Sequence, residues 1–367
     1  MAATTPLFKV FMPPTVRHAM EETLYSGFIA EGDKVKAFQE TVSSYLDCPH
    51  VVMTNSCTMA LTISFRLAGV GPGDEVISTP LTCIASNMPL VQLGAKPVWA
   101  DVDPHTGMMD PTQIEALITE RTKAILVLHK EGDLARLDEI IAIARRRDLK
   151  VIEDAAHALG AQYKGKRVGS HGDYVCFSLQ AIKHITTGDG GILVCRNPED
   201  QQRARAMKWF GIDRENRNTK NPWEADISDW GFKGNMTDIS ATIGLEQMNH
   251  LDEIVGKFNH NGRSYTDSLS QCAGATMIQR DPENFSTYWA YSMLAENRDQ
   301  LVEKLNNEGV AAGPIHLRND MYSIFKSSQR DLPNCGDFSA RELCLPCGWW
   351  VTDEERERIC RIIASGW

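Results

Sequence analysis

Short apolar runs alternate with longer segments of helical periodicity through the first two thirds of the chain, and this alternation restricts the possible folds most strongly. Strands that alternate with helices favour a mostly parallel sheet, because each connecting helix packs back onto one face of it. Both faces are then covered, and we predict an α/β fold with a mostly parallel seven-stranded sheet. The strand-length runs are residues 51–53, 75–77, 97–100, 124–128, 151–152, 174–177 and 192–194.

The pattern changes near residue 250. Helical periodicity, one strand-like alternation and a capping-box pattern follow one another from there to the end of the chain. We therefore expect a large domain over residues 1–250 and a smaller α+β domain over residues 251–367. The segments concerned are 251–270 (helix), 288–293 (strand), 298–309 (helix) and 352–364 (helix with the capping box).

Charge and apolar content exclude several classes of partner. The net charge of −10 argues against nucleic-acid or anionic-membrane binding, since both require a positive field. No apolar run approaches the roughly 20 residues that cross a bilayer, and the first five residues lack a signal-peptide pattern. We therefore expect a cytoplasmic protein that binds neither nucleic acid nor membrane.

Ten cysteines occur in the chain, mostly inside predicted strands or helices, where they are expected as small buried hydrophobic residues. Cys344 and Cys347 form a single CxxC pair without further ligands nearby. Metal and redox sites need more ligands or a redox domain, so we interpret this pair as coincidental and expect no metal.

An acid and a lysine follow two different predicted strands. Asp154 comes just after the run 151–152, while Ser178 and Lys183 follow the run 174–177. Ligands of such sheets bind beyond the carboxyl ends of the strands, so these side chains can converge. Because strand side chains alternate, one of Glu153 and Asp154 should face the site.

This combination matches the needs of pyridoxal 5'-phosphate (PLP). A lysine forms a Schiff base with its aldehyde, and an acid keeps its pyridine nitrogen protonated so that the ring accepts electrons. Ile182 and Ile185 flank Lys183 and favour its partial burial, which helps the amine to lose its proton. Gly190 and Gly191 allow a bulky ligand to approach the backbone. The alternatives are a surface lysine at 183 and a helix N-cap at Asp154.

A phosphate site is indicated by residues 55–61, where a predicted strand passes through a polar turn into an amphipathic helix. Backbone amides at a helix N-terminus bind phosphate. Taken alone the signal is weak, because serine and threonine at a helix start are usually only caps.

Several motifs, in order, resemble the DegT/StrS family of sugar aminotransferases, which are PLP enzymes of fold type I acting on nucleotide-linked keto sugars. The resemblance covers nearly the full length. The matching segments are 27–29 with Gly32, Val35 and Phe38; 73–77; 94–98; 101–103; 153–157; 177–178 with Lys183; and 231–233 with 235–238 and Ala241.

The resemblance implies a role for individual residues. Lys183 would be the Schiff-base lysine and proton shuttle, Asp154 would hold the pyridinium, and His157 would lie beside the ring. The phosphate would be bound by Ser178, the amides of Cys57 and Thr58, and Lys233 contributed by the second subunit of a homodimer with shared active sites.

The chain also departs from the common family forms. Cys83 stands where an aromatic residue usually stacks on the cofactor ring, and Cys57 replaces the glycine of a Ser-Gly-Thr turn. Residues 130–133 and 316–320 differ as well. The second segment lies where sugar or nucleotide contacts often occur, which makes His316 and Arg318 candidate substrate residues.

The resemblance favours a transaminase in which an amino acid, with glutamate as the expected donor, loads the cofactor, and a keto sugar accepts the amine. A pyridoxamine-dependent sugar dehydratase of the same family carries histidine in place of Lys183. A non-enzymatic regulatory protein would lack the lysine or the acid, and both are present. A transaminase that acts on a non-nucleotide keto-cyclitol remains open.

Overall fold

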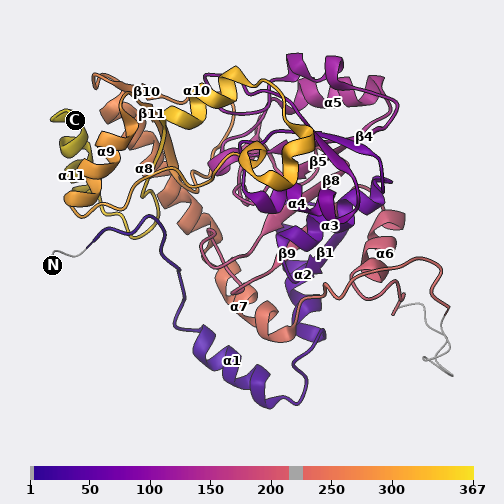
Figure 1. Cartoon of the computed structure of the whole chain (residues 1–367). Helices are drawn as coiled ribbons and strands as arrows, with labels where there is room; N and C mark the ends of the chain where they lie inside the picture. Colours follow the sequence, from indigo (N-terminus) through magenta and orange to yellow (C-terminus); the bar gives the residue numbers. More distant parts are fainter. Residues whose placement is uncertain (1–3, 215–225) are drawn as a thin grey trace.

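The computed structural model describes residues 4–214 and 226–367 of the 367-residue chain. Its main sheet has seven strands in the order β1-β9-β8-β5-β4-β2-β3, so the predicted α/β fold is confirmed (Figure 1). Only β9 is antiparallel to its two neighbours. The strands are β1 Val51–Thr54, β2 Glu75–Ser78, β3 Lys96–Trp99, β4 Thr122–Leu128, β5 Lys150–Asp154, β8 Tyr174–Ser178 and β9 Gly191–Cys195.

Both faces of this sheet are buried, because successive side chains of its strands enter different clusters. On β8, Cys176 packs into the cluster that contains helix α3 (Cys57–Leu67). Val175 and Phe177 pack into the cluster that contains helices α2 (Asp33–Leu46) and α8 (Leu251–Leu269). The helices along this part of the chain are α1 Val16–Tyr25, α2 Asp33–Leu46, α3 Cys57–Leu67, α4 Ile84–Gln92, α5 Leu137–Arg146 and α6 Pro198–Met207. Between α5 and α6, a two-stranded sheet joins β6 Gln162–Tyr163 to β7 Lys166–Arg167.

The helix predicted after the polar turn exists, but its predicted amphipathic character is wrong. Eight of the eleven residues of α3 are buried. The helix packs into the sheet on one side and contacts α4 and α6 elsewhere. A helix enclosed in this way needs apolar residues on most of its circumference.

A second sheet of three antiparallel strands lies in the C-terminal part, in the order β10-β11-β12. The predicted strand 288–293 begins later, as β11 Tyr291–Ala295, because Tyr288 has a φ of 45° and the backbone bends at residues 289–290. The N-cap half of the capping box is confirmed, since the Thr352 hydroxyl accepts a hydrogen bond from the amide of Glu355, whereas the Glu355 carboxylate accepts from Arg358 and Thr5. The remaining elements are α7 Asp238–Met248, α8 Leu251–Leu269, β10 Ala275–Met277, β11, α9 Arg298–Asn307, α10 Pro333–Arg341, β12 Glu342–Leu345 and α11 Asp353–Ala364.

The division at residue 250 stays a prediction. Helix α8 begins at Leu251, which agrees with a boundary there. However, the N-terminal segment contacts the C-terminal part of the chain, because Thr5 forms a β-bridge with Val310, just after α9. Figure 1 shows the N-terminal segment running from the C-terminal part of the molecule to α1, which projects from the main body. No described helix combines the length and apolar character needed to cross a bilayer.

Candidate active site

A cavity of about 330 Å³ lies at the carboxyl ends of β5 and β8. Most of the predicted site residues contribute to its wall, although they come from distant parts of the sequence. Those lining it are Cys57, Thr58, Cys83, Asp154, His157, Ser178, Lys183 and His316.

Asp154 is the last residue of β5 and is 3% exposed. Its Oδ2 accepts a hydrogen bond of 2.6 Å from the Ser86 hydroxyl, and its Oδ1 accepts one of 3.1 Å from the amide of Ala156. No helix follows, so the alternative of a helix N-cap does not apply. Burial raises the pKa of Asp154, against these hydrogen bonds and the charge of Lys183. Within residues 4–214 and 226–367 it forms no ion pair, and a cationic ligand would satisfy it.

Lys183 lies on the loop that follows β8. Burial lowers the pKa of its amine to about 8, although the negative charge of Asp154 acts in the opposite direction. Its Nζ lies 3.9 Å from the ring centroid of Trp289. This lysine is therefore not an ordinary surface lysine, because part of the population can be neutral near physiological pH.

His157 follows β5 on a turn and is 4% exposed. Its ring stacks on Trp289 with a centroid distance of 3.9 Å and an interplanar angle of 7°. Burial, together with the charge of Lys183, lowers its pKa well below the ordinary value, so the ring is neutral. Its Nδ1 is buried and has no hydrogen-bond partner in the described part of the chain. A polar ligand group in the cavity could pair with it.

The polar turn at the start of α3 has the geometry expected of a phosphate site. Ser56 caps the helix, since its hydroxyl accepts from the amide of Met59 at 3.2 Å. Cys57 and Thr58 then occupy the first turn, where amides lack helical partners. Ser178 reaches the same cavity from the end of β8.

Gly191 approaches protein backbone, whereas a ligand was the expected neighbour. A Cβ added at this position would lie 2.4 Å from the carbonyl carbon of Ser56 and 2.5 Å from the nitrogen of Cys57. The first residue of β9 therefore presses directly against the turn that opens α3. At Gly190 the nearest atom to an added Cβ would be the Thr187 hydroxyl oxygen.

Cys83 and His316 are far apart in the sequence, but both line the same cavity. Cys83 immediately precedes α4 and is partly exposed. The cavity wall therefore contains a cysteine at the position where the family resemblance led us to expect an aromatic residue. The Nε2 of His316 is buried without a partner among the described residues. Burial and the charges of Lys130 and Lys183 lower the pKa of His316 to about 3.

Two predicted site residues lie outside this cavity. Lys233 is exposed: its Nζ donates to Asn235 at 2.5 Å and lies 3.6 Å from the ring centroid of Trp209. The guanidinium of Arg318 makes a bidentate pair with Asp320, with contacts of 2.6 and 3.1 Å. The roles implied for Lys233 and Arg318 stay predictions.

The unusual segment 130–133 forms a buried ion cluster. The ammonium of Lys130 contacts the carboxylates of Glu131 and of Glu342 on β12. Glu131 has a φ of 47°, and burial raises its pKa to about 7. Glu131, Glu342 and Cys344 could geometrically surround a cation, but the Lys130 ammonium already contacts both carboxylates. All ten cysteines of the chain, including Cys347, have free thiols.

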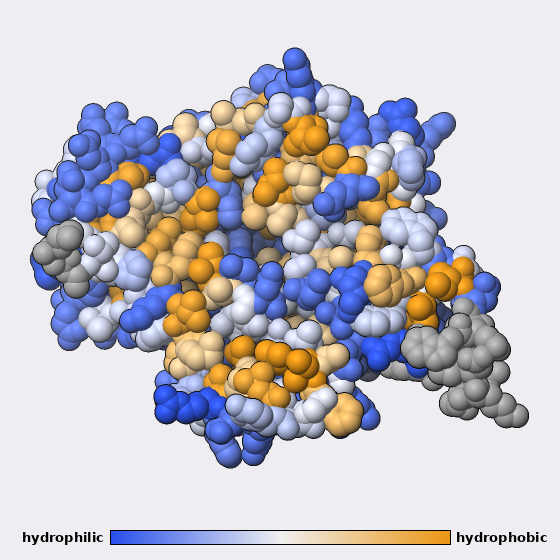
Figure 2. Space-filling view, turned by 60° about the horizontal axis from the view of Figure 1, so that its bottom comes forward, coloured by the Kyte–Doolittle hydropathy of each residue, from blue (hydrophilic) through white to orange (hydrophobic). Residues whose placement is uncertain are grey.

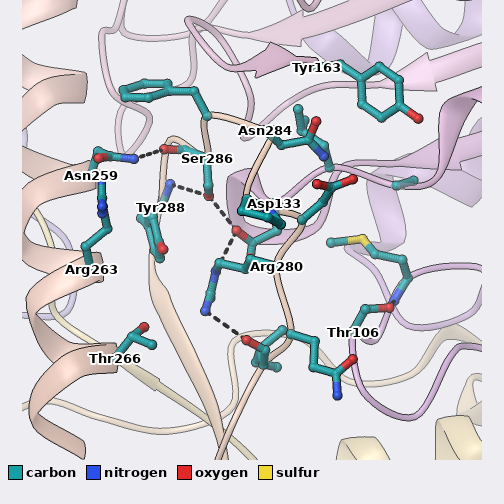
Figure 3. A pocket seen from close by; sticks show the side chains of 18 of the residues that line it. Thr106, Asp133, Tyr163, Asn259, Arg263, Thr266, Arg280, Asn284, Ser286 and Tyr288 are labelled. Atoms are coloured by element: carbon teal, nitrogen blue, oxygen red, sulfur yellow. Dashed lines mark hydrogen bonds and ion pairs between the residues drawn. The ribbon is translucent and has the colours of Figure 1, made fainter. Parts of the chain in front are cut away.

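A larger cavity of about 640 Å³ lies apart from these residues, between α8 and the loops around Asp133 and Arg280 (Figure 3). Figure 3 shows that one of its cationic side chains, Arg280, is engaged by neighbouring groups of the protein. Arg280 donates to Asp133 at 2.9 Å and to the carbonyl of Ile278 at 3.2 Å, and it lies 4.6 Å from the ring centroid of Tyr288. Size alone therefore does not identify the candidate active site, since the predicted catalytic groups line the smaller cavity.

Sequence reasoning missed two residues at this site, Ser86 and Trp289. Ser86 lies in the first turn of α4 and donates to Asp154, while Trp289 lies in the bend before β11 and contacts both His157 and Lys183. Neither belongs to a motif with its partner. Trp289 lies within the run 288–293 that was predicted to be a strand, and no separate feature of the sequence marks it as a site residue.

Comparison with known proteins places the chain among aminotransferases. The model of the DegT/DnrJ/EryC1/StrS aminotransferase family matches residues 14–364. The UDP-4-amino-4-deoxy-L-arabinose–oxoglutarate aminotransferase of Shewanella sediminis is 36% identical over 310 residues, which are 82% of this chain and 79% of that protein.

Solved structures agree with this. AtS13 from Actinomadura melliaura matches with a TM-score of 0.96 and 35% identity, covering 100% of both chains. Spr1654 from Streptococcus pneumoniae, solved in a PLP form, matches with a TM-score of 0.91 and 27% identity, covering 99% of this chain and 98% of that one.

Proposed function

The chain belongs to the DegT/DnrJ/EryC1/StrS aminotransferase family, and from that premise we propose that it is a PLP-dependent sugar aminotransferase. The amino donor is an amino acid, with glutamate as the expected one, and the acceptor is the keto group of a nucleotide-linked sugar. One observation carries the proposal: Lys183, with a lowered pKa, lines the same cavity as Asp154, which is buried and forms no ion pair with any described residue.

The residues present fit PLP as the cofactor. Its pyridinium would supply the positive charge that Asp154 lacks, and a polar ring substituent would satisfy the unpartnered Nδ1 of His157. Ser178 and the amides of Cys57 and Thr58 would hold its phosphate, which the N-terminus of α3 favours electrostatically. The relative solved in a PLP form supports the same assignment for this chain.

When bound, PLP supplies an electron-accepting ring for amine transfer. The side chains of this protein do the rest. The amine of Lys183 would hold the cofactor, and when free it would move a proton to and from the substrate carbon, because its lowered pKa makes both protonation states accessible. Asp154 would keep the ring nitrogen protonated, and Ser86 orients that carboxylate. Trp289 and Cys83 form part of the cavity wall.

The acceptor class rests on relatives. The Shewanella sediminis relative is named for a UDP-linked amino sugar and for oxoglutarate, the partner of glutamate in transamination. His316 lines the cavity, its Nε2 has no partner among the described residues, and it is the candidate for contact with a sugar hydroxyl. A keto-cyclitol acceptor and the dehydratase reaction are the alternatives that a substrate screen would test.

We also propose that the protein forms a homodimer with shared active sites and that it is located in the cytoplasm. Figure 2 shows apolar surface gathered on and beside the projection formed by α1. Large apolar side chains there are exposed, including Tyr25 at 85% and Phe28 at 80%. A surface of this kind usually marks an interface. Lys233, which lies outside the cavity of its own chain, would then reach the phosphate of the second subunit.

Visible absorption before and after glutamate tests the proposal most directly. We expect the purified protein, with or without added PLP, to have a cofactor band that bleaches when glutamate is added. A protein that takes up no PLP would overturn the cofactor assignment. Bound PLP that ignores glutamate would overturn the donor assignment and direct the search to other amino acids. A panel of nucleotide-linked keto sugars and keto-cyclitols, read by the return of the band, would then identify the acceptor class.

A further inference from the structure

Trp289 contacts both of the groups on which the proposed chemistry depends. Its indole stacks on the His157 ring, and the Nζ of Lys183 lies 3.9 Å from its ring centroid. Its Nε1 donates a hydrogen bond of 2.7 Å to the carbonyl of Ile182, the residue before Lys183. One side chain thus touches the ring of His157, the amine of Lys183 and the backbone that carries this lysine.

The indole is too enclosed to serve as a binding surface for a sugar. Trp289 is 1% exposed, so almost none of its area is available to a substrate. Stacking, the hydrogen bond from Nε1 and the attraction of an ammonium to the ring face are all directed at the protein itself. Its contacts are those of a side chain that holds other groups in place.

Phe8 supports this indole from a distant part of the sequence. Its ring stacks on Trp289 with a centroid distance of 4.5 Å and an interplanar angle of 22°. Phe8 comes from no helix or strand, yet the segment around it is held on both sides. Before it, Thr5 pairs with Val310 and the carbonyl of Pro6 accepts from Trp350.

After Phe8, the segment is held a second time. The Nε2 of Gln247 donates a hydrogen bond of 2.6 Å to the carbonyl of Phe11, and the Phe11 ring packs edge-on against Trp349. These contacts fix the backbone on both sides of Phe8. The ring of Phe8 is thereby kept against Trp289 although the segment lacks regular secondary structure.

We propose that Trp289 is a positioning residue for Lys183 and His157, and that Phe8 makes the N-terminal segment a working part of the active site by supporting the indole. The proposal rests on the assignment of PLP to this cavity. The indole holds the loop at Ile182 and keeps the His157 ring parallel to itself. It also attracts the Lys183 ammonium, so the amine and the imidazole are in place before the cofactor arrives.

Substitutions at Trp289 test this through PLP affinity and through Lys183 itself. We expect Trp289→Leu to weaken PLP binding about tenfold, because stacking, cation attraction and one hydrogen bond are lost together. Trp289→Phe keeps a ring and should lose about threefold, the effect of the hydrogen bond. The conservative variant thus separates the role of the ring from that of the indole nitrogen.

Labelling in cofactor-free protein gives a readout independent of turnover. An amine-reactive reagent, followed by mass spectrometry, reports the rate at Lys183 relative to the exposed Lys166. We expect this ratio to rise about threefold to fivefold in Trp289→Leu, since the ammonium form loses the attraction of the ring. A purely structural role would leave the ratio unchanged once the variant is shown to be folded by its thermal transition.

A matched pair on one segment tests the role of Phe8. Phe8→Leu should shift PLP affinity and the Lys183 labelling ratio in the same direction as Trp289→Leu, by about twofold to fivefold. Phe11→Leu alters the same segment away from the cavity and should leave both within twofold. Equal behaviour of Phe8→Leu and wild type would overturn the role of the segment, and unchanged labelling in Trp289→Leu would overturn the role of the indole. Wild-type protein that binds no PLP would instead contradict the proposed function, while the labelling ratio would still decide the positioning role.

Discussion

The hydroxyl of Ser86 donates a 2.6 Å hydrogen bond to Oδ2 of Asp154, which joins the first turn of α4 to the carboxyl end of β5. The amide of Ala156 holds the other carboxylate oxygen at 3.1 Å. Both donors are neutral, so the carboxylate is oriented while its charge remains available to a cationic ligand.

Asp154→Asn should therefore slow turnover by about tenfold to a hundredfold. Removing one member of a buried ion pair costs roughly 3–5 kcal/mol, and about half of that, if lost only in the transition state, gives this range. The asparagine can still accept one of the two hydrogen bonds. Ser86→Ala keeps the charge and should cost less, about threefold to tenfold, the effect of one hydrogen bond. Steady-state kinetics of the two variants compare the effect of removing the charge with the effect of removing the hydrogen bond that orients it. A larger loss of turnover in Ser86→Ala than in Asp154→Asn would contradict the expectation that the charge matters more.

Lys183→Ala should abolish turnover and leave a folded protein, since the side chain supplies the reacting amine but is not part of the apolar core. Steady-state turnover measures the loss of activity, and the thermal unfolding transition shows whether the variant is folded. Lys166→Ala, which removes an exposed lysine of β7, is the control and should behave as wild type. Normal turnover in Lys183→Ala would eliminate the assignment of the catalytic lysine.

The rate at which cofactor-free protein captures PLP should depend on pH through the amine of Lys183. Burial lowers the pKa of this amine to about 8, and only the neutral form attacks an aldehyde. The rate should rise about tenfold per pH unit below 8 and level off above it, as the neutral fraction saturates. Stopped-flow absorbance provides the measurement. A rate that still climbs steeply between pH 9 and 10 would indicate a solvated lysine instead.

Gly191→Ala should destabilise the fold by about 1–3 kcal/mol, because the new methyl group would press on the backbone of Ser56 and Cys57. It should also weaken PLP binding, as the same turn opens α3. Gly256→Ala is the matched control: this exposed glycine of α8 has open space around it and should gain about 0.5–1 kcal/mol in a helix. Chemical denaturation of both variants gives the comparison, and equal stability changes would refute the close approach at Gly191.

The larger features of the fold could be predicted because they depend on local patterns. Each of the seven apolar runs became a strand, since a short apolar segment between turns can be buried on both faces of a parallel sheet. The N-cap at Thr352 and the start of α8 at Leu251 are equally local. Boundaries that depend on distant contacts were harder to predict. The strand expected at 288–293 begins only at Tyr291, because Tyr288 has a φ of 45° and the backbone bends at residues 289–290.

The sequence by itself determined the mostly parallel sheet and the resemblance to a family, and it predicted that Lys183 and Asp154 converge, because periodicity and motif spacing are properties of neighbouring residues. Only the tertiary structure decided that Phe8, His157 and Trp289 stack together, that Ser86 holds Asp154, and that Arg318 is engaged by Asp320 outside the cavity. Apart from the Arg318–Asp320 pair, whose members are two residues apart, these contacts join segments that are far apart in the chain. Such side chains meet only when the whole core is packed, and no local pattern carries that information.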